Sequence, residues 1–517
     1  MYRKEDKKQL TMEEFMLPFG GHLRADNRWV KMAAFMPWDL IEEEYAKNMS
    51  EMEGRKALPA RLAFGAIFVK EEEGLTDERT LECVVENPYI QYFVGLKEFS
   101  NEAPFDASMM VHFRKRFSTE SIHKINEILY ERLAPKVEEL ASQGKPASQQ
   151  EEIPSIIGDD STAAQGEGTP ICESANEKES PASVGEESGK GKNKGTLILD
   201  ATVAPADIRY LTDLGLLNEC RENTEKMIET LWPHTNRQRR KTAYNRKKAR
   251  KSYMKVVKQR KPRPKAVQRA VLEQLEYVRM NLETLDRLLL CVAYAILSDA
   301  DLFRLCTICQ VYRQQKQMAD KGDHRCDNRI VSLRQPHVRC IVRGKARTPF
   351  EFGQKIHLSV VNGFTFIECQ SWDNFHEGTQ LIEAVERYRQ RFGFYPKVIL
   401  ADKAYRNRDN LHFCKKHGIR LSGPRLGRPP KDESLADQEQ AYQDGCQRNR
   451  IEGRNGVAKR RYGLDLIMAI LPETAMTEAA LNVLAMNVAH LLRVLLHFLG
   501  KMFASCWSSL RYVFITI

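Results

Sequence analysis

The sequence predicts a mixed α/β (α+β) fold in which a mixed sheet flanked by helices carries a helical insertion and follows a helical N-terminal domain. Short apolar runs bounded by turn residues occur at 196–200, 398–402 and 418–422, as expected for buried strands. Apolar residues recur at helical spacing through 22–135 and again through 214–339. Between the first helical region and the first strand lies a segment rich in Ser, Glu, Gly, Pro and Ala.

These changes in composition set the expected domain boundaries. The linker lacks the apolar residues needed to offset the entropy of ordering, so a flexible acidic segment is expected there. The predicted parts are an N-terminal tail at 1–21, a helical N-terminal domain at 22–135, the linker at 136–195, a sheet-containing domain at 196–495 with its basic insertion at about 214–339, and a C-terminal tail at 496–517.

The sheet is predicted to contain a hairpin. The stretch 350–368 reads as two strands, and Asn362-Gly363 at its centre is a strong hairpin turn dipeptide. We expect this hairpin to pair beside the strand at 196–200. A helix at about 378–391 and the two later strands then complete a mixed sheet covered by helices.

Three acidic residues stand where a phosphoryl-transfer site needs them. Asp200 ends the run Thr196-Leu-Ile-Leu-Asp, and Asp402 ends the run Val398-Ile-Leu-Ala-Asp, so each carboxylate is expected at the tip of a buried strand. Glu452 lies in a helical stretch with Arg448 and Lys459 at spacings of four and seven residues, which share one helix face. Such carboxylates can hold two hard divalent ions about 4 Å apart, one at the attacking oxygen and one at the leaving oxygen.

These residues resemble the DDE triad of bacterial insertion-sequence transposases of the IS-four/IS-five type, whose catalytic domain has the RNase-H-like fold. The group's signature is Tyr, two residues, Arg, three residues, Glu, six residues, Lys; Arg448, Glu452 and Lys459 match it, and Gly445 stands at the tyrosine position. The segments 87–96, 104–108 and 113–117 are similar to the N-terminal domain of the IS-five type, which implies that the helical domain at 22–135 is a DNA-binding domain.

The resemblance implies the site and its partners. It implies that Asp200, Asp402 and Glu452 are both the catalytic residues and the ligands of two Mg²⁺ ions, for which Mn²⁺ can substitute. It also implies double-stranded DNA as partner, as element ends and as target, with the protein acting as a homodimer or higher homo-oligomer on DNA.

A basic run adds a second candidate interface. Residues 237–265 are about half Lys or Arg and contain no acid, which favours neutralisation of phosphates over a merely solvated charged face. Arg448 and Lys459 are expected to contact phosphate beside the acidic site. From the basic run we expect the same of Arg246, Lys247, Lys248, Arg250 and Lys251.

Overall composition agrees with a polyanion partner but is less specific. The 517 residues include 80 Lys plus Arg against 69 Asp plus Glu, a net charge of +11. No signal-peptide pattern is apparent at the start, so a cytoplasmic, nucleoid-associated bacterial protein is expected. The apolar stretch 481–517 is interrupted by charged and His residues, which predicts a packed helix and no membrane partner.

Three functions remain compatible with the sequence. The favoured one is a DNA transposase that binds element ends and catalyses metal-dependent strand cleavage and strand transfer. The alternatives are an RNase-H-like nuclease that only hydrolyses, which uses the same two-metal chemistry, and a catalytically inactive transposase-derived DNA-binding protein. The presence of all three acids argues against the last.

Overall fold

The structure is a computed structural model, and it confirms the predicted α+β class with a mixed sheet and a predominance of helix. It describes residue 2 and the ranges 11–50, 56–143, 193–209, 212–235, 246–291, 296–342, 350–424, 427 and 434–515. Side chains are described throughout these ranges except at 19, 133–143 and 497–515. Most of the predicted linker, and residues 237–245 of the basic run, lie outside the described residues.

The described strands form one mixed sheet. β1 (Thr196–Pro205) pairs antiparallel with β3 (Phe350–Val361) on one side and parallel with β5 (Val398–Leu400) on the other. β6 (Arg420–Leu421) continues the parallel edge, while β2 (Arg339–Val342) and β4 (Phe364–Ser371) both pair antiparallel with β3. The expected hairpin is confirmed: Asn362 and Gly363 join β3 to β4, both with positive φ (50° and 83°).

One strand differs from its prediction. β1 was expected to end at Asp200, but it continues for five further residues to Pro205. The prediction was wrong because β3 pairs with this second half of β1, up to Pro205 opposite Gly353. The parallel pairing with β5 does stop earlier, at Ile198 opposite Leu400, so Asp200 lies just beyond the parallel part of the sheet.

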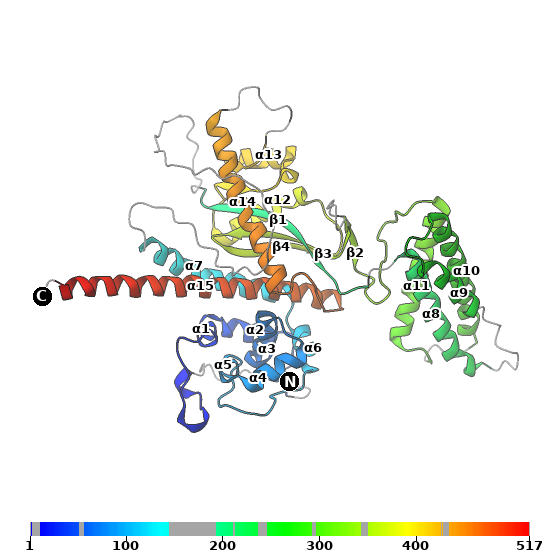
Figure 1. The fold of residues 1–517 in the computed structure, drawn as a ribbon, viewed down its shortest axis with the longest axis horizontal. Coiled ribbons are helices and arrows are strands. Elements are labelled where there is room, and N and C mark those ends of the chain that lie inside the picture. Colours follow the sequence, from blue (N-terminus) through cyan, green and yellow to red (C-terminus); the bar gives the residue numbers. More distant parts are fainter. Residues whose placement is uncertain are drawn as a thin grey trace.

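Helices cover the sheet, and the long helix α15 (Pro472–Ile515) runs across it (Figure 1). α14 packs against β1 and β5, and α15 against β4. The helices of this domain are α12 (Leu381–Phe392), α13 (Arg408–Lys416), α14 (Leu435–Arg461) and α15 (Pro472–Ile515), with the short 3-10 turns η5 (Glu377–Gln380) and η6 (Lys403–Tyr405).

The N-terminal helices pack on α15 and share its core. Asn487 of α15 donates hydrogen bonds to Asn126 of α7 (2.9 Å) and to the Thr365 carbonyl of β4 (2.7 Å), and these contacts are buried. The N-terminal domain and the sheet domain therefore share an apolar core, and inside it these buried amide groups are hydrogen-bonded across the boundary between the two domains. The elements are η1 (Met12–Glu14), η2 (Pro18–Gly20), α1 (Arg28–Phe35), α2 (Trp38–Ala46), α3 (Ala60–Glu73), α4 (Asp77–Glu86), α5 (Pro88–Phe93), α6 (Met109–Arg116) and α7 (Thr119–Gln143).

The expected helical insertion is present between β1 and β2. Its elements are α8 (Asp213–Leu231), η3 (Trp232–His234), α9 (Arg246–Val257), α10 (Pro264–Leu289) and α11 (Asp299–Lys321). Leu217, Val278 and Ile308, one from each long helix, belong to a core of its own that is separate from the core of the sheet. Figure 1 accordingly shows the insertion as a separate bundle beside the β2 end of the sheet.

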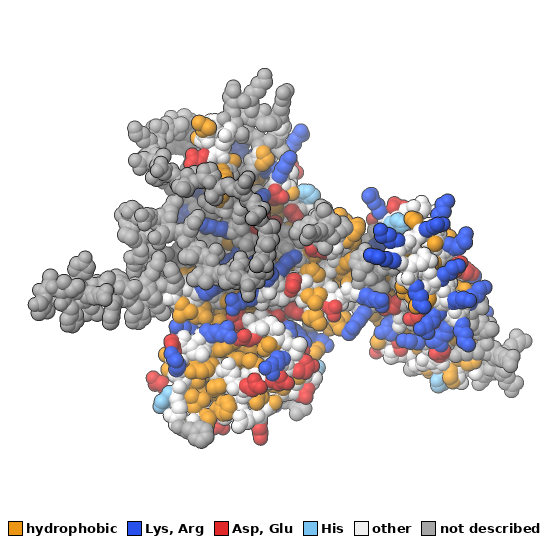
Figure 2. Space-filling model, in the orientation of Figure 1, with side chains coloured by type: hydrophobic (Ala, Val, Ile, Leu, Met, Phe, Trp, Pro, Cys, Tyr) orange, Lys and Arg blue, Asp and Glu red, His pale blue; other side chains and the backbone are white. Residues whose placement is uncertain are grey.

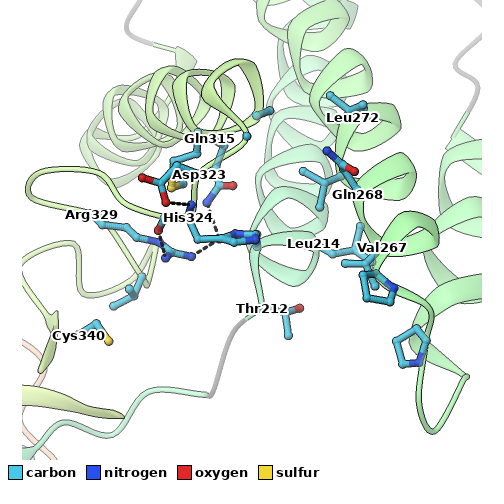
Figure 3. A pocket seen from close by; sticks show the side chains of 18 of the residues that line it. Thr212, Leu214, Val267, Gln268, Leu272, Gln315, Asp323, His324, Arg329 and Cys340 are labelled. Carbon is cyan, nitrogen blue, oxygen red and sulfur yellow. Dashed lines mark hydrogen bonds and ion pairs between the residues drawn. The ribbon is translucent and has the colours of Figure 1, made fainter. Parts of the chain in front are cut away.

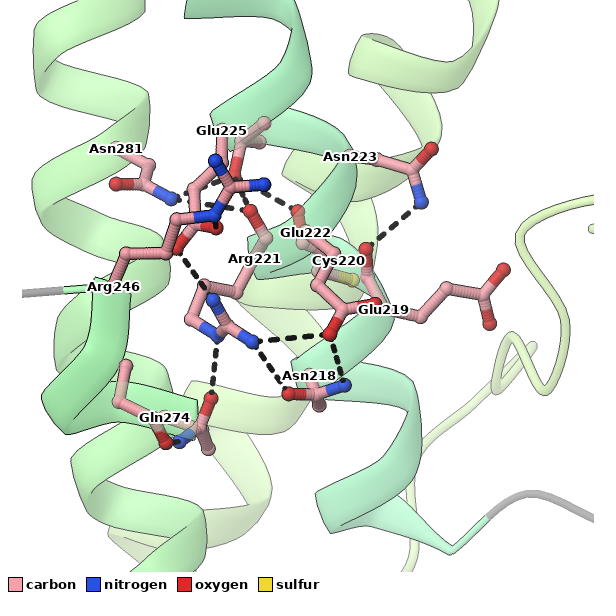
Figure 4. Close-up of polar contacts among 12 residues, drawn as sticks. Asn218, Glu219, Cys220, Arg221, Glu222, Asn223, Glu225, Arg246, Gln274 and Asn281 are labelled. Atoms are coloured by element: carbon pink, nitrogen blue, oxygen red, sulfur yellow. Dashed lines mark hydrogen bonds and ion pairs between the residues drawn. The ribbon is translucent and has the colours of Figure 1, made fainter. Parts of the chain in front are cut away.

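A buried arginine ties three helices of the insertion together (Figure 4). Arg221 of α8 is 1% exposed and contacts Glu225 at 2.5 Å, Asn218 at 2.8 Å and Gln274 of α10 at 3.2 Å. Gln274 in turn donates to the Ala249 carbonyl of α9 at 3.0 Å. The network therefore fixes α9, which carries the described part of the basic run, against α8 and α10.

One described segment, Pro472–Leu496 of α15, is long and apolar enough to cross a membrane. However, 72% of its most apolar window is buried inside the protein. Burial of this kind is typical of the core helix of a globular domain. A packed helix was predicted for 481–517, which overlaps this segment.

Candidate active site and nucleic-acid interface

The site begins where the parallel strands end. Because Ile198 is in register with Leu400, Asp200 and Asp402 each lie two residues beyond the last parallel pair. Neighbouring parallel strands deliver their carboxyl ends to the same edge, so both aspartates reach the same region of the sheet. α14 packs on β1 and β5 and brings Glu452 to this region.

One face of α14 contacts both aspartates. Arg448 donates to Asp402 Oδ1 at 3.0 Å, and its other terminal nitrogen lies 3.6 Å from Glu452 Oε1. Asn455, seven residues after Arg448 on the same helix face, donates to Asp200 Oδ2 at 2.8 Å. Two α14 side chains therefore contact the three acids: Arg448 contacts Asp402 and Glu452, and Asn455, which the sequence interpretation missed, contacts Asp200.

The site is open to solvent on the Asp402 and Glu452 side. Both side chains are 60% exposed, while Asp200 is half-buried in the sheet. Asp402 also caps η6, because its Oδ1 accepts the Lys403 backbone N–H at 2.7 Å. Exposed carboxylates remain accessible to a cation and to a polynucleotide.

The donor set suits a hard divalent cation, since carboxylate oxygens are the ligands such ions prefer. Asp402 and Glu452 already share one cationic group, the Arg448 guanidinium. Among the described residues, no three His, Cys, Asp or Glu side chains lie close enough to form a metal site in this arrangement. Binding of a metal by all three acids therefore requires Arg448 and the acids to move relative to one another.

The rest of the signature lies on the same helix. Lys459 stands seven residues after Glu452 and is half-buried near the end of α14. Gly445 holds the tyrosine position, and an added Cβ there would meet no atom of another described part of the chain within 4 Å.

The basic run presents an exposed helix face on the insertion. Lys247, Lys248, Arg250 and Lys251 of α9 are exposed, whereas Ala249 is buried against the Arg221 network. Figure 2 shows Lys and Arg side chains gathered over this bundle. An exposed array of cations held on a rigid helix is suited to neutralising phosphates.

Arg246 differs from its neighbours. Its guanidinium pairs with Glu225 at 3.0 Å and Glu229 at 2.6 Å, both on α8. These ion pairs anchor the first turn of α9 to the bundle and leave Arg246 less available to phosphate than the four cations that follow. The sequence interpretation, which placed it with those four, did not anticipate this packing.

A cavity of about 720 Å³ lies between the insertion and the β2 end of the sheet (Figure 3). Asp213 in its wall accepts from Gln315 at 2.8 Å and pairs with Arg329 and, at 3.6 Å, with His324. None of the three proposed catalytic acids lines it. The acidic site is therefore an open surface and not this cavity.

Two regions of the chain match transposase families. Residues 399–489 match the family described as "Transposase DDE domain", and residues 18–116 match "Transposase domain (DUF772)". The first range contains Asp402, Arg448, Glu452 and Lys459, and the second lies largely in the predicted N-terminal domain.

A curated relative is the "Uncharacterized protein ORF8 in nfe locus" of Rhizobium meliloti. It is 36% identical over 96 residues, which is 19% of this chain and 46% of that protein, so the similarity spans under half of the relative's length. No solved structure matches the chain.

Proposed function

We propose, from the premise that its two matched regions are transposase domains, that this chain is a DDE transposase of the IS-four/IS-five type that cleaves and joins DNA. The two matches support a DDE transposase. We assign catalysis and metal binding to Asp200, Asp402 and Glu452. The observation that carries this assignment is the single face of α14 that joins both sheet aspartates and bears the glutamate.

The three acids would hold two Mg²⁺ ions, or Mn²⁺ in their place. Bound there, the ions would supply Lewis-acid activation of the attacking oxygen and stabilisation of the leaving oxygen. Arg448 occupies the position between Asp402 and Glu452 and carries a planar fork of donors that matches a phosphate as well as a carboxylate. We assign to Arg448 and Lys459 the orientation of the scissile phosphate.

We propose that two parts of the protein have different roles in DNA binding. α9 supplies affinity without sequence preference, and the N-terminal domain recognises the element ends, with the protein acting as a homodimer or higher oligomer. In the N-terminal domain, Arg114 is already paired with Asp77 and Arg116 with Tyr45, while Lys115 between them is exposed. Base reading there must use other exposed side chains together with Lys115.

The proposed function is tested by looking for a product in which the element end is covalently joined to target DNA. The purified chain is incubated with Mg²⁺, a labelled duplex from the DNA flanking its reading frame, and a target plasmid. We expect cleavage at the element end and covalent joining of the freed 3′ hydroxyl to the plasmid. Cleavage without any joined product would favour the hydrolytic nuclease, and absence of both with DNA binding retained would favour the inactive DNA-binding protein.

Replacing Lys247, Lys248, Arg250 and Lys251 together by Gln should weaken binding to end DNA and random DNA alike. Each lost phosphate contact removes about 0.9 from the slope of log K against log salt concentration, because fewer counterions are released. Equilibrium titrations of both DNAs over a range of salt would measure this.

The matched control exchanges Lys and Arg at the same four positions, which keeps the charge and should keep both affinity and slope near the parental values. Arg246→Gln should change the slope least, since that side chain is committed to Glu225 and Glu229. An unchanged slope in the quadruple Gln variant would remove α9 from the DNA interface.

A further inference from the structure

Tyr405 is a buried phenol whose hydroxyl has no hydrogen-bond partner among the described residues. It is 0% exposed, and its ring stacks on that of His357 at 5.7 Å between centroids. His357 stands opposite Ala201 on β1, next to Asp200. A buried hydroxyl without a partner costs free energy, so its retention needs a reason.

Tyr405 lies close to Asp402, since its backbone N–H donates to the Asp402 carbonyl at 3.0 Å in η6. Burial, followed by the negative charges of Glu377, Asp200 and Asp402, raises the pKa of Tyr405 well above its usual value. The phenol therefore remains protonated at neutral pH and is available as a donor. Glu377 is paired with Lys355 at 3.1 Å, which leaves the two proposed catalytic aspartates as the acceptors of interest.

Two turns hold Tyr405 in this place. Asn410 donates to the carbonyls of Tyr405 (2.8 Å) and Gly378 (2.7 Å) and so joins η6 to η5. The turns touch closely: a Cβ at Gly378 would lie 2.5 Å from the Ala404 carbonyl oxygen. Because the two backbones are this close, any residue other than glycine at position 378 would force the backbone to shift. The phenol is thus fixed by its backbone as well as by its ring.

We infer that Tyr405 is a positioning residue of the proposed site, whose hydroxyl donates to the carboxylate of Asp200 or Asp402 when these gather around a divalent cation. The inference rests on the proposed function. A donor held at a fixed point restrains the orientation of a metal-binding carboxylate and leaves its other oxygen for the ion. The same hydroxyl is without a partner in the arrangement described, in which Arg448 and Asn455 hold the acids.

The test is Tyr405→Phe, which removes the hydroxyl and keeps the ring. We expect the Mg²⁺ concentration for half-maximal stabilisation of the full chain, measured by calorimetric titration or thermal shift without DNA, to rise about tenfold or more, as for a lost bond to a charged group. The Mg²⁺ half-saturation of cleavage should rise in parallel. The melting temperature without metal should not fall, because a buried hydroxyl without a partner is being removed.

Tyr462→Phe is the matched control, since Tyr462 is also 0% exposed and its hydroxyl likewise lacks a hydrogen-bond partner among the described residues. It lies near Glu72 and Arg461 and not beside the proposed acids, so its variant should keep the parental response to Mg²⁺. Gly378→Ala is the second variant. It should displace the Ala404 carbonyl and the adjoining Tyr405, and weaken the Mg²⁺ response without altering the ring.

The outcomes separate this inference from the proposed function. A parental chain with neither Mg²⁺ stabilisation nor Mg²⁺-dependent cleavage would overturn the proposed function itself. A parental chain that responds to Mg²⁺, with Tyr405→Phe indistinguishable from Tyr462→Phe, would overturn only the role of Tyr405. Loss of the response in Gly378→Ala but not in Tyr405→Phe would assign the effect to the turn backbone and would also overturn the role of the hydroxyl.

Discussion

Strand cleavage is expected to fall by orders of magnitude when Asp200 or Asp402 is replaced by Asn, or Glu452 by Gln. Each change removes an anionic metal ligand while nearly preserving the shape of the side chain. Affinity for DNA should change little, and Asp402→Asn should bind slightly more tightly because it releases one of the contacts that hold Arg448. Cleavage rates at saturating DNA, with binding measured separately, would show the separation.

Asp465→Asn is the control, since Asp465 is exposed in the turn after α14 and lies outside the proposed site. Residues that act as a unit give non-additive losses, so combining two of the three acid variants should cost little more than one alone. Near-parental cleavage by any single variant would exclude that residue from the metal site.

Arg221→Met is expected to lower the free energy of unfolding of the insertion by about 3–5 kcal/mol, the usual cost of removing one partner of a buried ion pair. The change leaves Glu225, which is 4% exposed, with only the half-exposed Arg246, and it removes the contacts of Asn218 and Gln274 with Arg221. Hydrogen exchange of the α8 and α10 amides should accelerate by at least about a hundredfold. Binding of α9 to DNA should weaken because the bundle that supports this helix becomes less stable.

Arg279→Met supplies the control on the same bundle. Arg279 also contacts two glutamates, Glu276 and Glu283, but its side chain is 41% exposed. Exposed pairs of this kind contribute little to stability because solvent screens them, so the rate of hydrogen exchange should change little. Equal acceleration in both variants would show that burial of the Arg221 network is not what stabilises the insertion.

Local patterns in the sequence were sufficient to predict most of the sheet. The Asn362-Gly363 turn and the apolar run before Asp402 are signals contained in a few neighbouring residues, and the structure contains both the hairpin and the strand. The end of β1 was not predictable in this way. Its second half is a strand because β3, about 150 residues later, pairs with it up to Pro205.

The proposed site could be predicted from the sequence only in part, because only some of its contacts are local. Helical spacing alone placed Arg448, Glu452 and Lys459 on one face, because that periodicity is local. Asn455 and Tyr405 were missed, since an amide within a basic helix and a tyrosine after an aspartate acquire significance only when the sheet brings Asp200 beside them. The pairing of Arg246 with α8 likewise depends on helix packing that no local pattern records.

The buried contact between Asn126 and Asn487 has a consequence for biosynthesis. The two residues are 361 positions apart, so the amide of Asn126 has no access to this partner until nearly all of the described chain has left the ribosome. Domains made early usually fold early. Here the N-terminal helices can form first, but α7 completes its packing against β4 and α15 only after α15 has been synthesised. A prematurely terminated product would therefore display the unmatched face of α7 to solvent and to quality control.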